Sequence, residues 1–141
     1  MTKISLRISD APDSSAEGVI DEGLARFNEE QAGYRDARPL AVLALQGEDE
    51  EVVGGLIGRT SMGLFFIDLV YLPPSLRGAG AGTQMLEMAE NEARARKCSA
   101  AVLYTITFQA PDFYKQQGYR ELGRIECAPP GHTRICMTKM L

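Results

Sequence analysis

The 141-residue sequence contains no tryptophan, one histidine and three cysteines. Cys98, Cys127 and Cys136 form no CxxC pair, and one histidine adds little to a Cys/His ligand set, so we expect no metal site. A few widely spaced cysteines, odd in number, are also typical of proteins in a reducing compartment. This pattern favours a cytoplasmic location.

Long hydrophobic runs are absent as well. The most apolar stretch covers residues 64–72 and is interrupted by Asp68, whereas a helix that spans a bilayer needs about 20 apolar residues. The first seven residues include Lys3 and Arg7 but not the apolar core of a signal peptide. We therefore expect no association with a membrane.

Basic charge is scarce, because 15 lysines and arginines stand against 19 acidic residues, for a net charge of −4. Binding to nucleic acid needs a basic stripe, so we expect no nucleic-acid partner. The charge is also uneven: residues 1–70 carry six basic and thirteen acidic side chains, and residues 71–141 carry nine and six. This asymmetry suits an anionic ligand in the second half and a cationic one in the first. Ordinary surface solvation is the alternative.

The composition is that of one globular domain. Hydrophobic residues make up 45% of the chain and charged residues 24%. A chain of this length buries about two thirds of its unfolded surface and can form a core without disulfide bonds or bound metal ions. We predict a single domain over residues 1–141.

Hydrophobic periodicity predicts alternating strands and helices. A capping box at Ser14 and Glu17 begins a helix that ends near Gly33, and two further helices cover residues 83–97 and 111–117. Strands are predicted over residues 3–8, 39–45, 51–57, 64–72, 100–105, 119–125 and 133–140.

The strand–helix–strand unit within residues 64–105 makes its two strands parallel, whereas the hairpins on either side are antiparallel. The sheet is therefore predicted to be mixed. Residues 64–72 are so apolar that we expect them to be covered on both faces.

The segment R-G-A-G-A-G at residues 77–82 lies between this strand and the following helix. Helix N-terminal amides lack helical partners, and glycines let a phosphate approach the backbone, so the segment predicts a phosphate or pyrophosphate site. It is not a Walker loop, since no Gly-Lys-Ser/Thr follows, and it fails the G-x-G-x-x-G fingerprint. A simple tight turn is the alternative.

The surrounding residues are more specific. R-x-x-G-x-G after the strand end V-x-L-P-P resembles motif A of the GNAT superfamily of acyl-CoA N-acyltransferases. A second block, A-P-D-F-Y-K-Q-Q-G-Y at residues 110–119, resembles the later motif A-x-x-F-Y-x-x-x-G-F/Y of that family, in the same order and at a similar separation. With its F-Q-A-P segment and P-x-G-H loop, the chain most resembles small single-domain bacterial members.

The resemblance implies an α/β GNAT fold, with a mixed central sheet of about six to seven strands flanked by helices. It also implies that the strand over residues 64–72 splays from its parallel neighbour at 100–105, which leaves a slot for the pantetheine arm of acetyl-CoA. The backbone of Val70, Tyr71 and Leu72 would bind that arm and form an oxyanion hole. The residues implied to bind the pyrophosphate are Arg77, Gly78, Ala79, Gly80, Ala81, Gly82 and Thr83.

Three positions carry further implications of the resemblance. Tyr114 matches the family's tyrosine that protonates the departing CoA thiolate; a packed aromatic is the alternative. Thr107 stands where many members carry an asparagine that binds the pantetheine, and its hydroxyl has a shorter reach. Ala81 stands where a larger isoleucine or leucine is common, which predicts slightly looser packing.

The acceptor amine must also lose a proton. Asp68 is the one charge inside the most apolar strand, and a buried carboxylate needs a reason, so it is our candidate base, acting directly or through water. An aspartate satisfied by backbone or arginine partners is the alternative. Glu22, Glu29 and Glu30 are weaker candidates for amine recognition, and His132 is one for proton transfer.

We therefore predict an acetyl-CoA-dependent N-acetyltransferase that acts on a primary amine of a small molecule or peptide, by direct attack in a ternary complex. One alternative is a catalytically idle acyl-CoA-binding regulatory module. Another is a nucleotide-binding protein that uses the same glycine-rich turn. Small members of the family often dimerise, so a homodimer is also expected.

Overall fold

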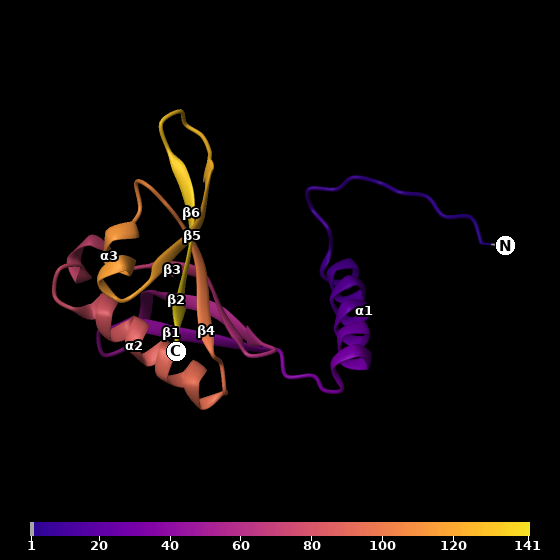
Figure 1. Cartoon of the computed structure of the whole chain (residues 1–141), viewed down its shortest axis with the longest axis horizontal. Helices are drawn as coiled ribbons and strands as arrows, with labels where there is room; N and C mark the ends of the chain where they lie inside the picture. The colour runs from indigo at the N-terminus through magenta and orange to yellow at the C-terminus, as the bar shows by residue number, and fades with distance from the viewer. Residues whose placement is uncertain (1) are drawn as a thin grey trace. The chain divides into compact units, whose positions relative to one another are not determined.

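The computed structural model describes residues 2–141. These residues divide into two compact units, one that ends at Arg35 and one that runs from Asp36 to Leu141. Figure 1 labels the helices and strands of both units.

The N-terminal unit contains one helix, α1 (Ser14–Ala32). Its N-cap is Asp13, whose Oδ1 accepts a 2.7 Å hydrogen bond from the backbone amide three residues on, so the cap predicted at Ser14 is one residue too late. Gly33 ends the helix as predicted, with a φ of 88°. The strand predicted over residues 3–8 is wrong: these residues are irregular, and between residues 2 and 35 the structure has no strand with which they could pair.

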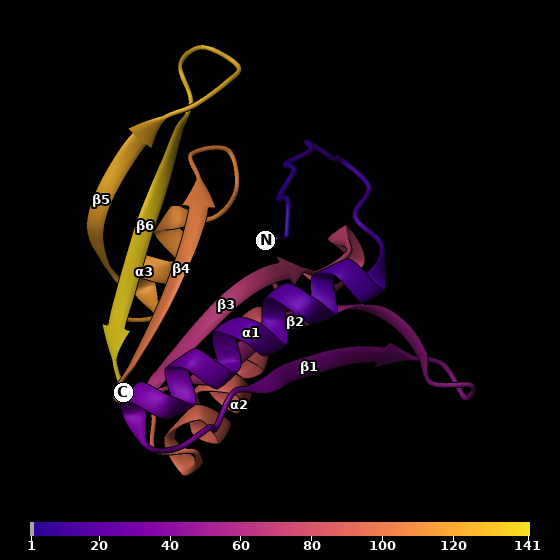
Figure 2. The ribbon, with the colours of Figure 1, turned by 90° about the vertical axis from the view of Figure 1, so that its right-hand side faces the viewer.

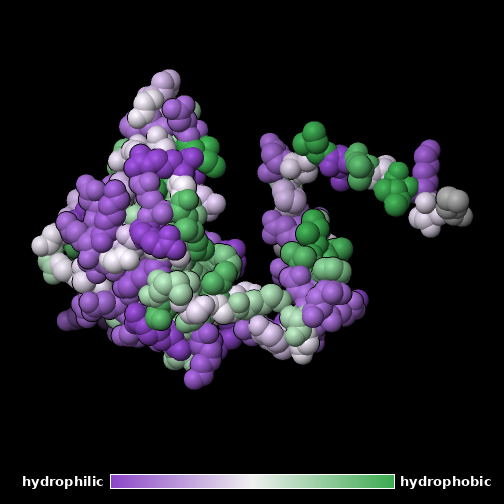
Figure 3. All heavy atoms as spheres, viewed as in Figure 1, coloured by the Kyte–Doolittle hydropathy of each residue, from purple (hydrophilic) through white to green (hydrophobic). Residues whose placement is uncertain are grey.

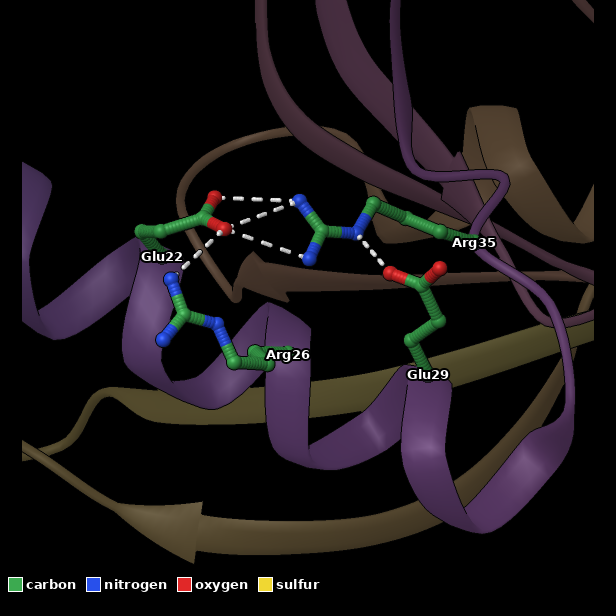
Figure 4. A network of polar contacts seen from close by, with 4 residues as sticks. All are labelled: Glu22, Arg26, Glu29 and Arg35. Carbon is green, nitrogen blue, oxygen red and sulfur yellow. Dashed lines mark hydrogen bonds and ion pairs between the residues drawn. The ribbon is translucent and has the colours of Figure 1, made fainter.

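Helix α1 has a charged side and an apolar side. Arg35 donates hydrogen bonds to Glu22 at 3.0–3.3 Å and to Glu29 at 2.8 Å, and Arg26 lies 3.7 Å from Glu22 (Figure 4). The hydrogen bond and charge of Arg35 lower the pKa of the Glu22 carboxyl. Hydrophobic side chains also lie at the surface of the helix (Figure 3). Two of the acidic side chains considered for amine recognition therefore already have an arginine partner.

The larger unit is built on a six-stranded mixed sheet in the order β1-β2-β3-β4-β6-β5, in which only β3 and β4 are parallel. The mixed α/β fold with a parallel pair and flanking helices is as predicted. The strands are β1 (Arg38–Gln46), β2 (Glu51–Ser61), β3 (Leu64–Tyr71), β4 (Ala100–Ile106), β5 (Arg120–Glu126) and β6 (Thr133–Met140). The helices are η1 (Pro74–Leu76, a 3₁₀ turn), α2 (Ala81–Ala95) and α3 (Pro111–Gln116).

The parallel pair splays apart. Pairing between β3 and β4 ends at Ile67 and Leu103, although both strands continue. At this level β3 carries a bulge, because Asp68 is left out of the register with β2. A bulge bends its strand, and Figure 2 shows the two halves of the sheet diverging from β3 and β4 onward. The bulge thus explains the opening of the sheet.

Helix α2 covers one face of this sheet and forms the core with it. Its buried side chains include Met85, Leu86, Ala89 and Ala93, which are at helical spacing. The core residues from the strands include Leu56, Phe65, Ile67, Ala101, Leu103, Ile135 and Met137.

Ala81 borders a surface hollow of about 210 Å³ that Val42 and Met85 also line, so a larger side chain has room at this position. Replacing Ala81 with leucine is expected to raise the free energy of unfolding by about 1 kcal/mol, since the larger side chain buries apolar surface in the hollow. Denaturant titration of the variant measures this gain. Ala95→Leu, at the exposed end of the same helix, is the control and should change stability little. Equal gains from both variants would contradict the prediction.

Candidate active site

The diverging strands border a cleft of about 1070 Å³, which is slightly above the usual range of about 300–1,000 Å³ for small-molecule sites. Ala79, Ala81 and Thr107 of the predicted site do not line it. The predicted site residues that do line it are Asp68, Val70, Tyr71, Leu72, Arg77, Gly78, Gly80, Gly82, Thr83 and Tyr114.

One end of the cleft is formed by the glycine-rich turn before α2. Gly78 and Gly80 have φ angles of 81° and 84°, a left-handed conformation that glycine adopts without strain. Gly80 is the N-cap of α2 and no side chain caps this helix, so its first backbone amides are available to a ligand. The Arg77 side chain is held at the same place, because its Nε donates a 2.8 Å hydrogen bond to the Leu72 carbonyl. The turn therefore has the properties of a phosphate site.

The wall of the cleft is the second half of β3. Beyond Ile67 this strand pairs with β2 but not with β4, so its backbone groups on the β4 side have no strand partner. Leu69, Val70 and Tyr71 are 65%, 38% and 56% exposed. Within residues 36–141 this half of the strand is therefore open to the cleft, so this unit alone does not cover residues 64–72 on both faces as predicted.

Tyr114 reaches the cleft from α3. The residue is 7% exposed and its ring packs edge-on against Phe113 and Tyr119, with ring centroids 5.2 and 5.8 Å away. Burial raises the pKa of the Tyr114 hydroxyl above its ordinary value of 10.0, so the group keeps its proton. Within residues 2–141 no buried side-chain oxygen or nitrogen lacks a hydrogen-bond partner. Because none of the hydrogen bonds in this part of the chain uses the Tyr114 hydroxyl, that oxygen is not fully buried, and Tyr114 is one of the residues that line the cleft.

Asp68 is not the buried carboxylate that the sequence suggests. Its side chain is 43% exposed, and its Oδ1 accepts a 2.7 Å hydrogen bond from Arg59, whose guanidinium lies over the Phe66 ring at 4.5 Å. The bulge in β3 places it at the surface of the cleft rather than in the core. It therefore has an arginine partner, which was the alternative considered for it.

Thr107 and His132 contact each other beside the cleft. The Thr107 hydroxyl lies 3.1 Å from Nδ1 of His132 and accepts a 3.2 Å hydrogen bond from the Thr133 amide. The His132 ring packs edge-on against Phe108, which does line the cleft, at a centroid distance of 5.0 Å. The Thr107 side chain is thus already engaged by its neighbours.

Sequence reasoning missed several cleft residues at the end of β4, in the loop after it and at the start of β6, among them Tyr104, Phe108, Gln109 and Arg134. Gln109 has a structural role, since its side-chain oxygen accepts hydrogen bonds from Thr105 at 3.3 Å and from the Ile106 amide at 3.0 Å. Phe108 and Gln109 belong to the F-Q-A-P segment of the family resemblance, which gave them no role in the site. No local pattern marks Tyr104 or Arg134, because they meet the cleft only through strand order.

Over residues 2–141 the structure contains no cluster of three His, Cys, Asp or Glu side chains that could hold a metal ion. None of the helices in this part of the chain is long and apolar enough to cross a membrane. All three cysteines are free thiols, and burial raises the pKa of the Cys98 thiol.

Comparison with known proteins agrees with this geometry. The model of the acetyltransferase (GNAT) family matches residues 7–119. Acetyltransferase Atu2258 of Agrobacterium fabrum is 34% identical over 118 residues, which cover 84% of this chain and 85% of that protein. Blasticidin-S acetyltransferase of Streptomyces morookaense is 40% identical over 111 residues, which cover 75% of this chain and 80% of that protein.

Solved structures are similar over nearly the whole chain. The crystal structure of an Agrobacterium tumefaciens protein assigned as an acetyltransferase has a TM-score of 0.88 at 30% identity, and the match covers 98% of this chain and 100% of that one. An acetyltransferase from Bacillus cereus has a TM-score of 0.75 at 26% identity, with coverages of 96% and 98%.

Proposed function

The chain belongs to the acetyltransferase (GNAT) family, and from that premise we propose that it transfers an acetyl group from acetyl-CoA to a primary amine by direct attack in a ternary complex. One observation carries the proposal. The glycine-rich turn, the unpaired edge of β3 and the free hydroxyl of Tyr114 all border one cleft. Such a reaction needs a site that binds an anion, backbone groups that polarise a carbonyl and a proton donor for the leaving thiolate. The turn, the edge of β3 and Tyr114 can supply these three functions in that order.

Acetyl-CoA, when bound, supplies the activated acetyl group. We propose that Arg77 and the first amides of α2 hold its pyrophosphate, since a guanidinium and helix N-terminal amides both favour anions. The backbone of Val70, Tyr71 and Leu72 would hold the pantetheine arm through its unpaired groups. Thr107 is the weakest member of the predicted set, because its hydroxyl is engaged by His132 and Thr133.

In the proposed reaction the amine nitrogen forms a bond to the acetyl carbon and the carbon–sulfur bond breaks. A backbone amide of β3 would stabilise the negative charge that develops on the carbonyl oxygen. Tyr114 would give its proton to the sulfur and recover one from solvent. Asp68 would take the proton that the amine loses, directly or through water, from its position on the bulge of β3.

We propose a small molecule rather than a peptide as the acceptor. The blasticidin-S acetyltransferase that resembles this chain is named for a small-molecule substrate. This resemblance does not identify the amine that the present chain acetylates.

An acceptor screen tests the function. The purified protein is incubated with acetyl-CoA and a panel of primary amines, and the free thiol is measured as it forms. Calorimetry with CoA, ATP and NAD runs beside it. Transfer to at least one amine supports the proposal. CoA binding without any transfer would favour an idle acyl-CoA-binding module, and failure to bind CoA would overturn the assignment of the turn.

The turn can be probed separately. Replacing Arg77 with alanine is expected to raise the Kd for CoA about tenfold, because a charge-assisted hydrogen bond to a phosphate contributes about 1.5 kcal/mol. Calorimetry on the variant measures the change. Arg38→Ala, at the start of β1 and outside the cleft, removes the same charge as a control. If both variants bind CoA as the parent does, Arg77 does not contact the ligand.

Three further expectations, on domain organisation, location and oligomeric state, are part of the proposal. The two units would form one domain, since the family match over residues 7–119 crosses their boundary. Free thiols fit a cytoplasmic location. A homodimer would form through β5, an edge strand on which Leu122 and Ile125 are 54% and 66% exposed. Analytical ultracentrifugation of Leu122→Lys checks the last point, because a dimer that survives would not use this edge.

A further inference from the structure

Arg134 extends from β6 on the side of the sheet opposite α2. It is paired in register with Ile106 of β4, and Tyr104 lies diagonally beside it on the same face. The residues one position away, Leu103 and Ile135, point the other way into the core under α2. Arg134 and Tyr104 thus reach the cleft from the face away from the proposed pyrophosphate site.

The charge of Arg134 is not neutralised within residues 2–141, since no ion pair in this part of the chain involves it. The nearby carboxylate is already matched, because Asp68 pairs with Arg59 at 2.7 Å. Arg77, at the other end of the cleft, also has no carboxylate partner within residues 2–141, and its Nε donates to the Leu72 carbonyl. On the face opposite α2, Arg134 is therefore a guanidinium without a charge partner in the described part of the chain.

We propose that Arg134 binds a carboxylate of the acceptor, so that the substrate class is a small amine that also carries a carboxylate. This rests on the proposed function, because it assigns the second substrate of the same cleft. A guanidinium binds a carboxylate through two parallel hydrogen bonds, which fixes the orientation of the ligand as well as its position. The exposed rings of Tyr104 and Phe108, which are 59% and 58% accessible, offer apolar walls for the part between the two charges.

The strand register sets the spacing of those charges. Asp68 follows the last residue of β3 that pairs with β4, which places it level with Tyr104. Arg134 pairs two residues farther along β4, a displacement of about 7 Å at the rise of a strand, and β6 lies two strands from β3, which adds about 10 Å across the sheet. An acceptor with its amine near Asp68 and its carboxylate on Arg134 therefore needs several atoms between the two groups. ω-Amino carboxylates fit this spacing better than α-amino acids.

The test measures binding and transfer separately. ω-Amino carboxylates of three to six carbons, and the corresponding primary amides, are titrated into the CoA-loaded protein by calorimetry and are also assayed as acceptors. We expect the carboxylates to bind about tenfold to hundredfold more tightly than the amides, and Arg134→Gln to remove that difference. Arg134→Lys should restore part of it. Arg120→Gln removes an arginine from β5 outside the cleft and should leave the difference intact.

The outcomes separate the two proposals. Carboxylates and amides that bind equally to the parent protein, or a preference that survives in Arg134→Gln, would overturn the role of Arg134. If the carboxylates bind more tightly through Arg134 but no acetyl group is transferred, the proposed carboxylate site is supported and the proposed acetyltransferase activity is contradicted. If Arg134→Gln binds CoA more weakly than the parent protein does, Arg134 contacts CoA and not the acceptor, which would also overturn its proposed role.

Discussion

Replacing Tyr114 with phenylalanine is expected to lower kcat by about 10² to 10³-fold, which is the usual contribution of a general acid. The ring should stay in place, since Phe113 and Tyr119 hold it edge-on and only the hydroxyl is lost. The Kd for CoA and the free energy of unfolding should therefore change little. Steady-state kinetics with thiol detection, calorimetry and denaturant titration measure the three quantities.

Tyr119→Phe is the matched control, because it removes the same atom from a neighbouring buried tyrosine. The Tyr119 hydroxyl donates a 2.8 Å hydrogen bond to Glu90, away from any reacting group. Burial and this hydrogen bond raise the pKa of Tyr119 far above its usual range. We expect Tyr119→Phe to lower stability by about 1 to 3 kcal/mol and to leave kcat nearly unchanged. Similar kinetic losses in the two variants would remove the case for Tyr114 as the acid.

The pH profile gives a second check on Tyr114. Because burial raises its pKa above 10.0, the protonated form that donates to sulfur persists as the pH rises to that value. The same direction means that its contribution to folding is complete below pH 10 and is lost only as the pH rises through the higher folded value. We expect no fall in kcat from this group at any pH up to 10. A descending limb below pH 10 that disappears in Tyr114→Phe would contradict the assignment.

Replacing Lys139 with methionine is expected to lower the free energy of unfolding by about 3 kcal/mol. Lys139 Nζ lies 2.9 Å from Oε1 of Glu90, whose side chain is only 3% exposed. Removing one partner of a buried pair leaves the other charge uncompensated, which costs about 3 to 5 kcal/mol. The lower end applies here, because Lys139 is 23% exposed and Arg94 lies 4.0 Å from the same oxygen. Denaturant titration at neutral pH measures the loss.

Two further variants test whether that loss of stability comes from a buried charge on Glu90. Lys115→Met removes the partner of Glu121, an exposed pair at 3.9 Å, and should change stability by no more than about 0.5 kcal/mol. The double variant Glu90→Gln with Lys139→Met should recover part of the loss, since no buried charge remains. If Lys139→Met costs no more than Lys115→Met, the pair at Glu90 is not a buried one in solution.

Periodicity and turn residues identified most of the secondary structure. Strands β3 and β6 and helices α2 and α3 lie within two residues of their predicted bounds, because continuous apolar runs, Pro73-Pro74 and Gly118 mark them locally. The strand predicted over residues 3–8 failed for the opposite reason. Its alternating pattern is local, but a strand forms only where a second strand completes its hydrogen bonds, and no pattern within the segment specifies that partner.

The candidate site divides in the same way. The glycine-rich turn and Tyr114 belong to short motifs whose residues are adjacent in the sequence. The sequence alone therefore predicts both of them and the family to which the chain belongs. Asp68 looked buried because its neighbours in sequence are apolar. A one-residue bulge, which depends on pairing with β2, turns it to the surface beside Arg59. Arg134 and Tyr104 lie 30 residues apart and meet only because β6 is inserted beside β4. Local sequence therefore determined the family and predicts the anion site, whereas long-range strand pairing decided the shape and charge of the cleft where β4 and β6 border it.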